Sequence, residues 1–246
     1  CMSSSKRVSK INSRLVSPFG PSIMVGYMPD GIYKDFKTII ERVLKEKRRT
    51  HTTQLAGRIE EEWTIGEDEI WQTQTEEFLN AVSVQYGKQL INRIFGEGIE
   101  WDAQQKTPQN VVVESKCVGG WVNEMKSGEY NPVHYHPFCN LTSVFYFNNI
   151  DKKFLKEMIA PANENMSGTK VEPGTSGDGM LELIYKSGIN FEQGTFRVTP
   201  EEKMFLIFPS FLLHTVYPFI SDKKRISASF NFQLSSNSEI INFGVK

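Results

Sequence analysis

The sequence predicts a mainly β protein with α-helices near its N-terminus and a β-rich core of the jelly-roll or closed-barrel type. Apolar residues of the 246-residue chain follow helical spacing in two segments before residue 105. From about Val111 onward the period changes to two, which is the period of a strand. The candidate strands follow one another without a long helix between them, as in jelly rolls and barrels. We expect residues 1–105 to form a mainly helical region packed on a core of residues 106–246, within one structural domain.

The N-terminal half contains two segments with an apolar stripe of helical period. The first begins after Pro29, where Asp30 is the expected N-cap, and extends to about Glu46. The second is clearer, and Gly96 and Gly98 close it. Its stripe repeats at every fourth position: Phe78, Val82, Tyr86, Leu90 and Ile94. Residues 22–27 could form a strand, and residues 48–75 are expected to be a loop with a possible short helix.

Eight short segments in the second half are rich in β-branched and aromatic residues and are separated by Gly, Pro and Asn clusters. This alternation is typical of antiparallel strands joined by turns. The candidate strands are Val111–Val118, Gly120–Met125, Leu141–Asn148, Met180–Tyr185, Thr195–Val198, Met204–Phe208, His214–Phe219 and Arg225–Leu234. Residues 151–179 interrupt them with turn-forming residues, so we expect an exposed loop over one end of the core.

Charge and cysteine content argue against several classes of protein. Lys+Arg 28 and Asp+Glu 29 leave a net charge of -1, which gives no overall field toward nucleic acid or an anionic membrane. The basic run Lys45–Arg49 ends the first predicted helix and is expected to be solvated. The 3 cysteines have no CxxC spacing and favour a reducing, cytoplasmic compartment over a disulfide framework. No apolar stretch is long enough for a signal peptide or a membrane span.

Three of the 4 histidines lie in the β-rich half: His134 and His136 in NPVHYHPF, and His214 in FPSFLLHTVYP. Residues two apart in an extended segment point to the same face, so His134 and His136 can present two imidazoles to one point. His214 on a neighbouring strand would add a third nitrogen ligand. The simpler alternative is that the first two are surface residues beside a turn and that His214 is a hydrogen-bonded core histidine. The combination of an HxH pair with a distal histidine favours a metal site.

Arg225 follows His214 in the segment KKRISASFNF, on what should be the next strand. A turn and a return strand would bring it back toward the metal. Its guanidinium presents a planar fork that matches a carboxylate, and Ser227 on the same face can add a hydroxyl donor. The alternative is a solvated arginine at a strand end, beside Lys223 and Lys224. Together with the histidines, Arg225 indicates an anion site near the metal.

The order HxH, apolar strand, distal His and RxS resembles the 2-oxoglutarate and iron(II) oxygenase superfamily, whose usual motif is HxD…H…RxS. More narrowly, GGWVNEMKSGEYNPVHYHPFCNLTSVFYF and FLIFPSFLLHTVYPFISDKKRISASFNF look like a prolyl-hydroxylase-like 2OG-Fe(II) oxygenase family found in bacteria and phages. The resemblance covers about Gly119 to Phe232, apart from the insertion. It implies a double-stranded β-helix, a cupin-like jelly roll, for the oxygenase core.

The resemblance also implies roles for particular residues. His134 and His214 would be iron ligands, Arg225 and Ser227 would bind the distal carboxylate of 2-oxoglutarate, and Tyr146 would add a hydrogen bond. His136 departs from the family pattern, because it stands where the usual carboxylate ligand would be. Three neutral imidazoles leave the double charge of iron(II) uncompensated, whereas a carboxylate would cancel half of it.

Three alternatives are open at position 136. His136 binds iron directly, which we favour; water or Glu129 takes its place; or the site holds another metal. An imidazole reaches slightly farther than an aspartate side chain, so a small shift of the strand would accommodate it.

The expected activity is that of an Fe(II)- and 2-oxoglutarate-dependent dioxygenase that uses dioxygen and releases succinate and CO2. Its substrate is unidentified; the prolyl hydroxylase branch makes hydroxylation of a peptide or an amino-acid side chain the first hypothesis, with substrate contacts in loop 151–179. Neither nucleic acid nor membrane is expected as a partner, and a homodimer is a possible assembly. One alternative is a three-histidine cupin-like dioxygenase that does not use 2-oxoglutarate, against which Arg225 and Ser227 argue. The other is a non-catalytic jelly-roll module with a binding or structural role.

Overall fold

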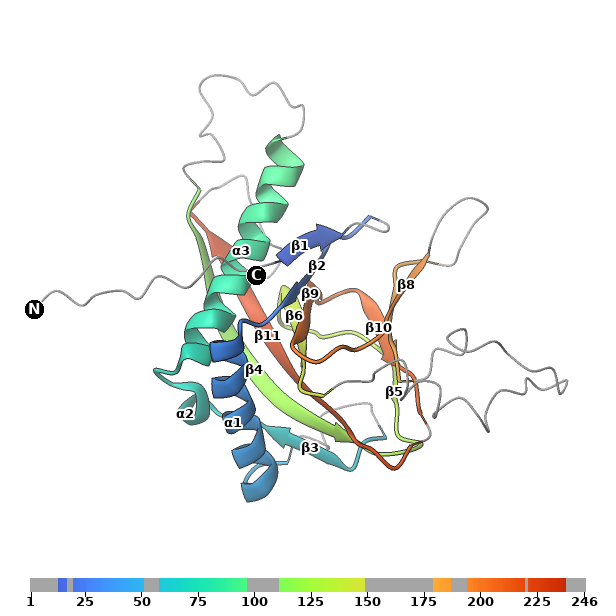
Figure 1. The fold of residues 1–246 in the computed structure, drawn as a ribbon. Coiled ribbons are helices and arrows are strands. Elements are labelled where there is room, and N and C mark those ends of the chain that lie inside the picture. The colour runs from blue at the N-terminus through green and yellow to red at the C-terminus, as the bar shows by residue number, and fades with distance from the viewer. Residues whose placement is uncertain are drawn as a thin grey trace, which may run out of the picture.

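The chain folds into three layers, consisting of helices, a seven-stranded sheet and a four-stranded sheet. The computed structural model describes residues 13–16, 20–50, 58–96, 111–148, 179–186, 194–219 and 221–237. The strand pairs in both sheets are antiparallel. Figure 1 shows the helices on one side of the large sheet and the small sheet on the other. This is the mainly β jelly roll with N-terminal helices that the sequence predicts.

The seven-stranded sheet combines strands from both halves of the chain. Its order is β1 (Ser13–Val16), β2 (Ile23–Tyr27), β9 (Met204–Pro209), β6 (Leu141–Tyr146), β11 (Arg225–Ser236), β4 (Val113–Met125) and β3 (Glu61–Thr64). The segment before residue 105 therefore supplies strands at both edges of this sheet as well as helices. The division of the chain at residues 105 and 106 stays a prediction.

The four-stranded sheet faces the large sheet across a second apolar core. Its order is β5 (Asn131–His134), β10 (Leu213–Val216), β7 (Leu181–Ile184) and β8 (Thr195–Val198). Along β10, Val216 is buried between the sheets whereas Leu213 is exposed, as the period of two requires. The inner face of β6 contributes Val144 and Tyr146 to the same core.

The helices cover the outer face of the seven-stranded sheet. They are α1 (Asp30–Glu46), the short α2 (Glu67–Ile70) and α3 (Gln74–Gly96). Phe36 of α1 is fully buried, with its ring centroid 4.9 Å from that of Phe147 and 5.6 Å from that of Phe230. Both predicted helices are thus confirmed as core-facing elements. The predicted N-cap is wrong by one residue: Pro29 is the N-cap, and the Asp30 carboxylate instead pairs with Lys203 at 2.9 Å.

Four strands differ from the prediction. β3 lies in the segment expected to be a loop, and β1 and β5 were not among the predicted strands. β4 is one strand, although the Gly119–Gly120 pair predicted a break within it. Its register against β11 moves from Asn231–Gly119 to Phe232–Cys117, so a β-bulge forms there instead of a turn.

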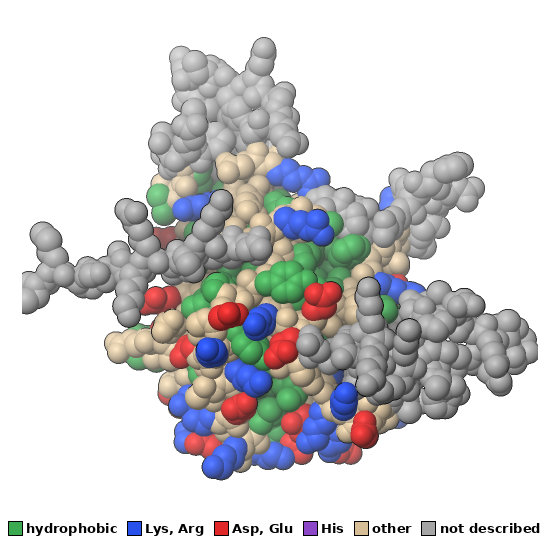
Figure 2. Space-filling model, in the orientation of Figure 1, with side chains coloured by type: hydrophobic (Ala, Val, Ile, Leu, Met, Phe, Trp, Pro, Cys, Tyr) green, Lys and Arg blue, Asp and Glu red, His purple; other side chains and the backbone are tan. Residues whose placement is uncertain are grey.

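The face drawn in Figure 2 carries basic and acidic side chains interspersed, with no large area of one sign. The basic run after α1 is exposed and forms ion pairs, including Lys47–Glu61 at 2.9 Å and Arg49–Asp68 at 3.5 Å. These pairs agree with the expected solvated face. None of the helices in the described ranges is long and apolar enough to cross a membrane. Residues 151–178 of the expected loop lie outside the described residues.

Candidate metal centre

Three histidines converge where the small sheet faces the large one. His134 on β5 and His214 on β10 are direct cross-strand partners, and their ring centroids are 4.2 Å apart. His136 follows the end of β5, and its Nε2 lies 3.2 Å from Nε2 of His214. One nitrogen from each ring can be chosen so that all three lie within 4.8 Å of one another. The structure therefore brings the HxH pair and the distal histidine to one point.

Two of these rings are oriented by backbone carbonyls. Nδ1 of His134 is 2.7 Å from the oxygen of Pro132, and Nδ1 of His214 is 2.9 Å from the oxygen of Leu212. A carbonyl only accepts hydrogen bonds, so each Nδ1 must carry the proton and each Nε2 keeps its lone pair. Burial lowers the pKa of His134, and burial together with the two neighbouring histidines holds the pKa of His214 well below its usual value. Both rings are therefore neutral near pH 7 and could each offer Nε2 to a metal.

The donor set fits a divalent transition metal that prefers nitrogen ligands. Two nitrogens that each lie about 2.1 Å from one ion, with an angle of about 90° at the ion, would be about 3 Å apart. The Nε2 atoms of His136 and His214 are 3.2 Å apart, which is close to this distance. The same distance also suits an N–H···N hydrogen bond in the protein without metal. His214 is 5% exposed and His136 8% exposed, so an ion here would be shielded from water on the protein side.

No carboxylate completes the set within the described part of the chain. The group that could hold an ion consists of the three histidines alone. Both carboxylate oxygens of Glu129 already accept backbone N–H bonds, one from Glu60 at 3.0 Å and the other from Lys126 at 2.6 Å. The geometry therefore argues against Glu129 as a substitute for the residue at position 136.

Arg225 enters the site from the opposite wall. The strand β11 follows β10 in the chain, as expected, but it lies in the seven-stranded sheet, so the guanidinium faces the histidines across the sandwich. Arg225 is 2% exposed, and its Nη1 donates to Ser227 Oγ at 3.2 Å. Its Nε and Nη2 have no partner among the described residues. A buried cation with free donors requires an anion, so this wall fits a carboxylate ligand.

Tyr146 lies next to this cation. Tyr146 on β6 is the cross-strand partner of Ser227, and the Arg225 guanidinium is 5.2 Å from the centre of its ring. Its hydroxyl is buried without a hydrogen-bond partner in the described structure. Burial raises the pKa of Tyr146, with the charge of Arg225 acting in the opposite direction. The hydroxyl is thus a neutral donor available beside the guanidinium.

One pocket joins the histidines and Arg225, and several of its lining residues were not predicted from the sequence. The additional polar residues are Asn123, Asn131, Thr142, Ser143 and Ser229. For all of them except Ser143, which lies on the opposite face of β6 from Val144, the signal that could have identified them is the period of two: a polar residue at an inward position of an apolar strand is unusual in a core. The sequence alone did not say which face of each strand points inward.

The comparisons agree with this fold. Residues 119–231 match the family described as "Putative 2OG-Fe(II) oxygenase", and this segment contains all six predicted site residues. A prolyl-4-hydroxylase structure from Pseudomonas putida has 15% sequence identity and a TM-score of 0.50, covering 87% of this chain and 92% of that one. A prolyl hydroxylase from Trichoplax adhaerens has 13% identity and a TM-score of 0.50, covering 86% of this chain and 83% of that one. None of the curated proteins matches the chain.

A cupin-like jelly roll in which three converging imidazoles face a buried arginine is the arrangement expected of a metal-dependent enzyme. The family match identifies which kind of metal-dependent enzyme this is. Over residues 119–231 the chain is that of a 2OG-Fe(II) oxygenase, an oxidoreductase. Enzymes of this family use Fe(II), 2-oxoglutarate and dioxygen. The two structural likenesses, at these identities, show the fold alone.

Proposed function

We propose that His134, His136 and His214 hold iron(II), and that the wall containing Arg225 binds the distal carboxylate of 2-oxoglutarate. In this assignment Ser227 and Tyr146 assist Arg225. One observation carries the proposal: three imidazoles from one side and a guanidinium with two unpartnered nitrogens from the facing sheet line the same pocket. We further propose that the enzyme hydroxylates a peptide or an amino-acid side chain and releases succinate and CO2.

The side chains divide this work between the two walls. The carbonyls of Pro132 and Leu212 keep two histidines in the tautomer that offers Nε2, so the rings need not reorganise to bind a metal. Arg225 and Tyr146 fix one end of the dicarboxylate by charge and by hydrogen bonding, and this orients its other end toward the histidines. Bound iron(II) would supply the dioxygen chemistry.

Position 136 sets the charge of the centre. A third imidazole in place of a carboxylate leaves the ion more positive and therefore more strongly attracted to an anionic co-substrate. Trp121, whose ring centroid is 5.4 Å from that of His136, and the Ser210 carbonyl, which accepts the His136 backbone N–H at 3.0 Å, hold this segment in place. Direct ligation by His136 is the alternative that this placement supports.

The substrate class is supported by the similar folds rather than by the pocket. Both structures are prolyl hydroxylases, and that from Trichoplax adhaerens was solved with a peptide fragment of the hypoxia inducible factor oxygen degradation domain. A cytoplasmic location is part of the proposal as well, in line with the free thiols of Cys117 and Cys139.

The test is anaerobic addition of iron(II) and then 2-oxoglutarate, monitored for a visible metal-to-ligand charge-transfer band. We expect the band in wild type and its loss in Arg225→Ala at low co-substrate concentration. Succinate formation, with a peptide library screened for gain of one oxygen atom, then tests the substrate class. Turnover that does not require 2-oxoglutarate would contradict the proposal and favour a three-histidine dioxygenase. Folded protein that takes up no iron would favour a non-catalytic module.

A further inference from the structure

A buried polar row crosses the large sheet at the level of the site. Glu62 on β3 is the cross-strand partner of Asn123 on β4, Asn123 pairs with Ser227 on β11, and Ser227 pairs with Tyr146 on β6. Cross-strand partners point to the same face, with Cβ atoms about 5 Å apart. Glu62 is 0% exposed and Asn123 5% exposed. The row therefore extends from an edge strand to the proposed co-substrate wall.

The Glu62 end of this row contains acceptors without donors. Neither carboxylate oxygen of Glu62 has a hydrogen-bond partner in the described ranges, and neither has Oδ1 of the adjacent Asn123. An ionised carboxylate can only accept hydrogen bonds, so it could not satisfy that amide oxygen. A protonated Glu62 could, because its O–H donates across the strand pair.

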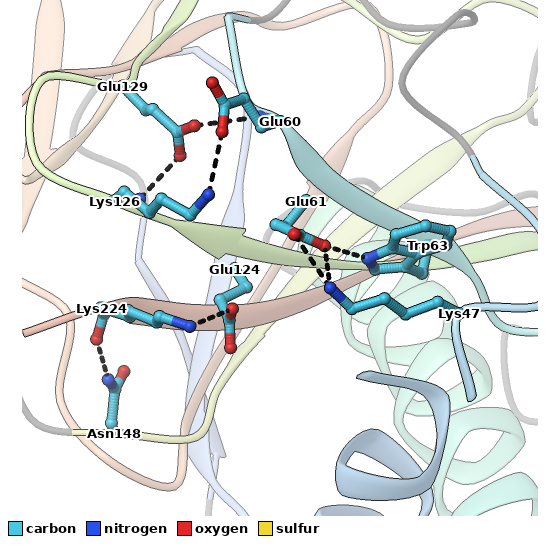
Figure 3. Close-up of polar contacts among 9 residues, drawn as sticks. All are labelled: Lys47, Glu60, Glu61, Trp63, Glu124, Lys126, Glu129, Asn148 and Lys224. Atoms are coloured by element: carbon cyan, nitrogen blue, oxygen red, sulfur yellow. Dashed lines mark hydrogen bonds and ion pairs between the residues drawn. The ribbon is translucent and has the colours of Figure 1, made fainter. Parts of the chain in front are cut away.

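The charges around Glu62 favour the protonated form. Burial, followed by the negative charge of Glu129, raises the pKa of Glu62 to about 7. Figure 3 shows how Glu129 is fixed by the backbone N–H groups of Glu60 and Lys126. Two lysines of the adjoining segments are ion-paired to other carboxylates: Lys126 pairs with Glu60 at 2.9 Å, and Lys47 pairs with Glu61.

The state of Glu62 determines which end of the Asn123 amide is available to the pocket. In the structure Oδ1 is the buried, unpartnered atom of this amide, and Asn123 lines the pocket beside Ser227. If this oxygen is the end that meets Glu62, the cross-strand partner, the amide presents its NH2 donors to the pocket. An ionised Glu62 would attract those donors instead and leave the amide oxygen, an acceptor, facing an anionic ligand.

We propose that protonated Glu62 is a positioning residue that holds the Asn123 amide with its NH2 group toward the pocket, where it donates to the 2-oxoglutarate carboxylate bound by Arg225. This inference rests on the proposed function. If Glu62 acts in this way, the affinity for 2-oxoglutarate falls as rising pH removes the proton from Glu62. Protonation of the histidines would act with the opposite sign, because it weakens binding at low pH.

The experiment is the dissociation constant of 2-oxoglutarate for the anaerobic iron(II) protein between pH 6 and 8, in wild type and Glu62→Gln. A hydrogen bond to a charged group is worth about a tenfold change or more in affinity, so we expect wild-type binding to weaken at least fivefold over this range. Glu62→Gln can still donate to Asn123 and should keep the low-pH affinity at all pH values. Glu129→Gln should move the wild-type midpoint to lower pH.

Glu61→Gln is the matched control, because it removes the same charge from the neighbouring position of β3, which is ion-paired to Lys47. It should leave the pH profile unchanged. A wild-type slope that persists in Glu62→Gln, or unaltered affinity in Asn123→Leu, overturns the inference. If 2-oxoglutarate binds to none of the proteins, the proposed function fails instead. The Glu62–Asn123 hydrogen bond can then be tested in the metal-free protein by infrared spectroscopy. We expect a carboxylic-acid band that titrates near neutral pH, disappears in Glu62→Gln and shifts in Asn123→Leu. Absence of this band in wild type refutes the bond.

Discussion

Replacing Arg225 by methionine should make the ligand-free protein more stable while abolishing co-substrate binding. Arg225 is 2% exposed, and burial lowers its pKa. A buried ion without a counter-ion costs several kcal/mol, whereas loss of the Nη1–Ser227 bond costs about 1 kcal/mol. Methionine keeps most of the apolar volume, so we expect a net gain of about 1–3 kcal/mol in the free energy of unfolding.

Urea unfolding of the two proteins, with and without iron(II) and 2-oxoglutarate under anaerobic conditions, measures both effects. At a hundred times its dissociation constant, the co-substrate should stabilise wild type by about 2.7 kcal/mol and the methionine variant not at all. Arg225→Lys, which keeps the charge but loses the planar fork, should gain no stability and bind more weakly. A methionine variant less stable than wild type without ligand, or one equally stabilised by 2-oxoglutarate, would refute the reasoning.

Four further predictions concern the metal, the core and pH. Loss of a residue that only supports a metal ligand weakens metal binding by roughly 10–100-fold. His136→Ala should weaken iron(II) binding by more than this in an anaerobic titration. A smaller effect would show that His136 is not a ligand. Gly120→Ala should destabilise by about 1–3 kcal/mol, since its Cβ would lie 2.4 Å from a ring atom of the buried Phe230; unchanged thermal unfolding would contradict this. Phe36→Ala should cost about 3–5 kcal/mol in denaturant unfolding by leaving a cavity under α1, and a cost below 1 kcal/mol would mean that the helix repacks. Because the pKa of Glu62 is raised to about 7, its contribution to stability is complete below about pH 4.5 and is lost as pH rises through 7; at most about 3 kcal/mol should disappear in wild type but not in Glu62→Gln.

The helices and most strands could be predicted because their side chains repeat with a clear period. β3 could not, since its sequence EEWT has two adjacent glutamates and little strand signal. It forms because β4 offers a free edge and because Trp63 packs against the helix-side core. This is a tertiary effect that overrides local propensity. The Gly119–Gly120 pair was misread for a similar reason, because the contact that requires a small residue at 120 comes from distant Phe230.

The candidate site was partly readable for a different reason. HxH and RxS place their members two apart, so the sequence itself indicates that each pair shares a face. Which sheet carries each pair depends on how the strands are ordered, and no local pattern contains that information. The histidines and Arg225 were therefore expected together, but on successive strands rather than on facing walls. Asn123 and Glu62 were missed because their environment is created by strand pairing.

The placement of two binding functions on two opposing sheets has a mechanical consequence. A dicarboxylate that reaches from Arg225 on β11 to a metal held by His134 and His214 would tie the two halves of the sandwich together. Such a tie restrains the separation of the sheets, so amide hydrogen exchange in β5 and β10, strands that belong only to the small sheet, should slow when the co-substrate is bound. The short strands around the histidines would then depend on the ligand for rigidity, whereas the long pair β4 and β11 is joined along its length by its own antiparallel ladder.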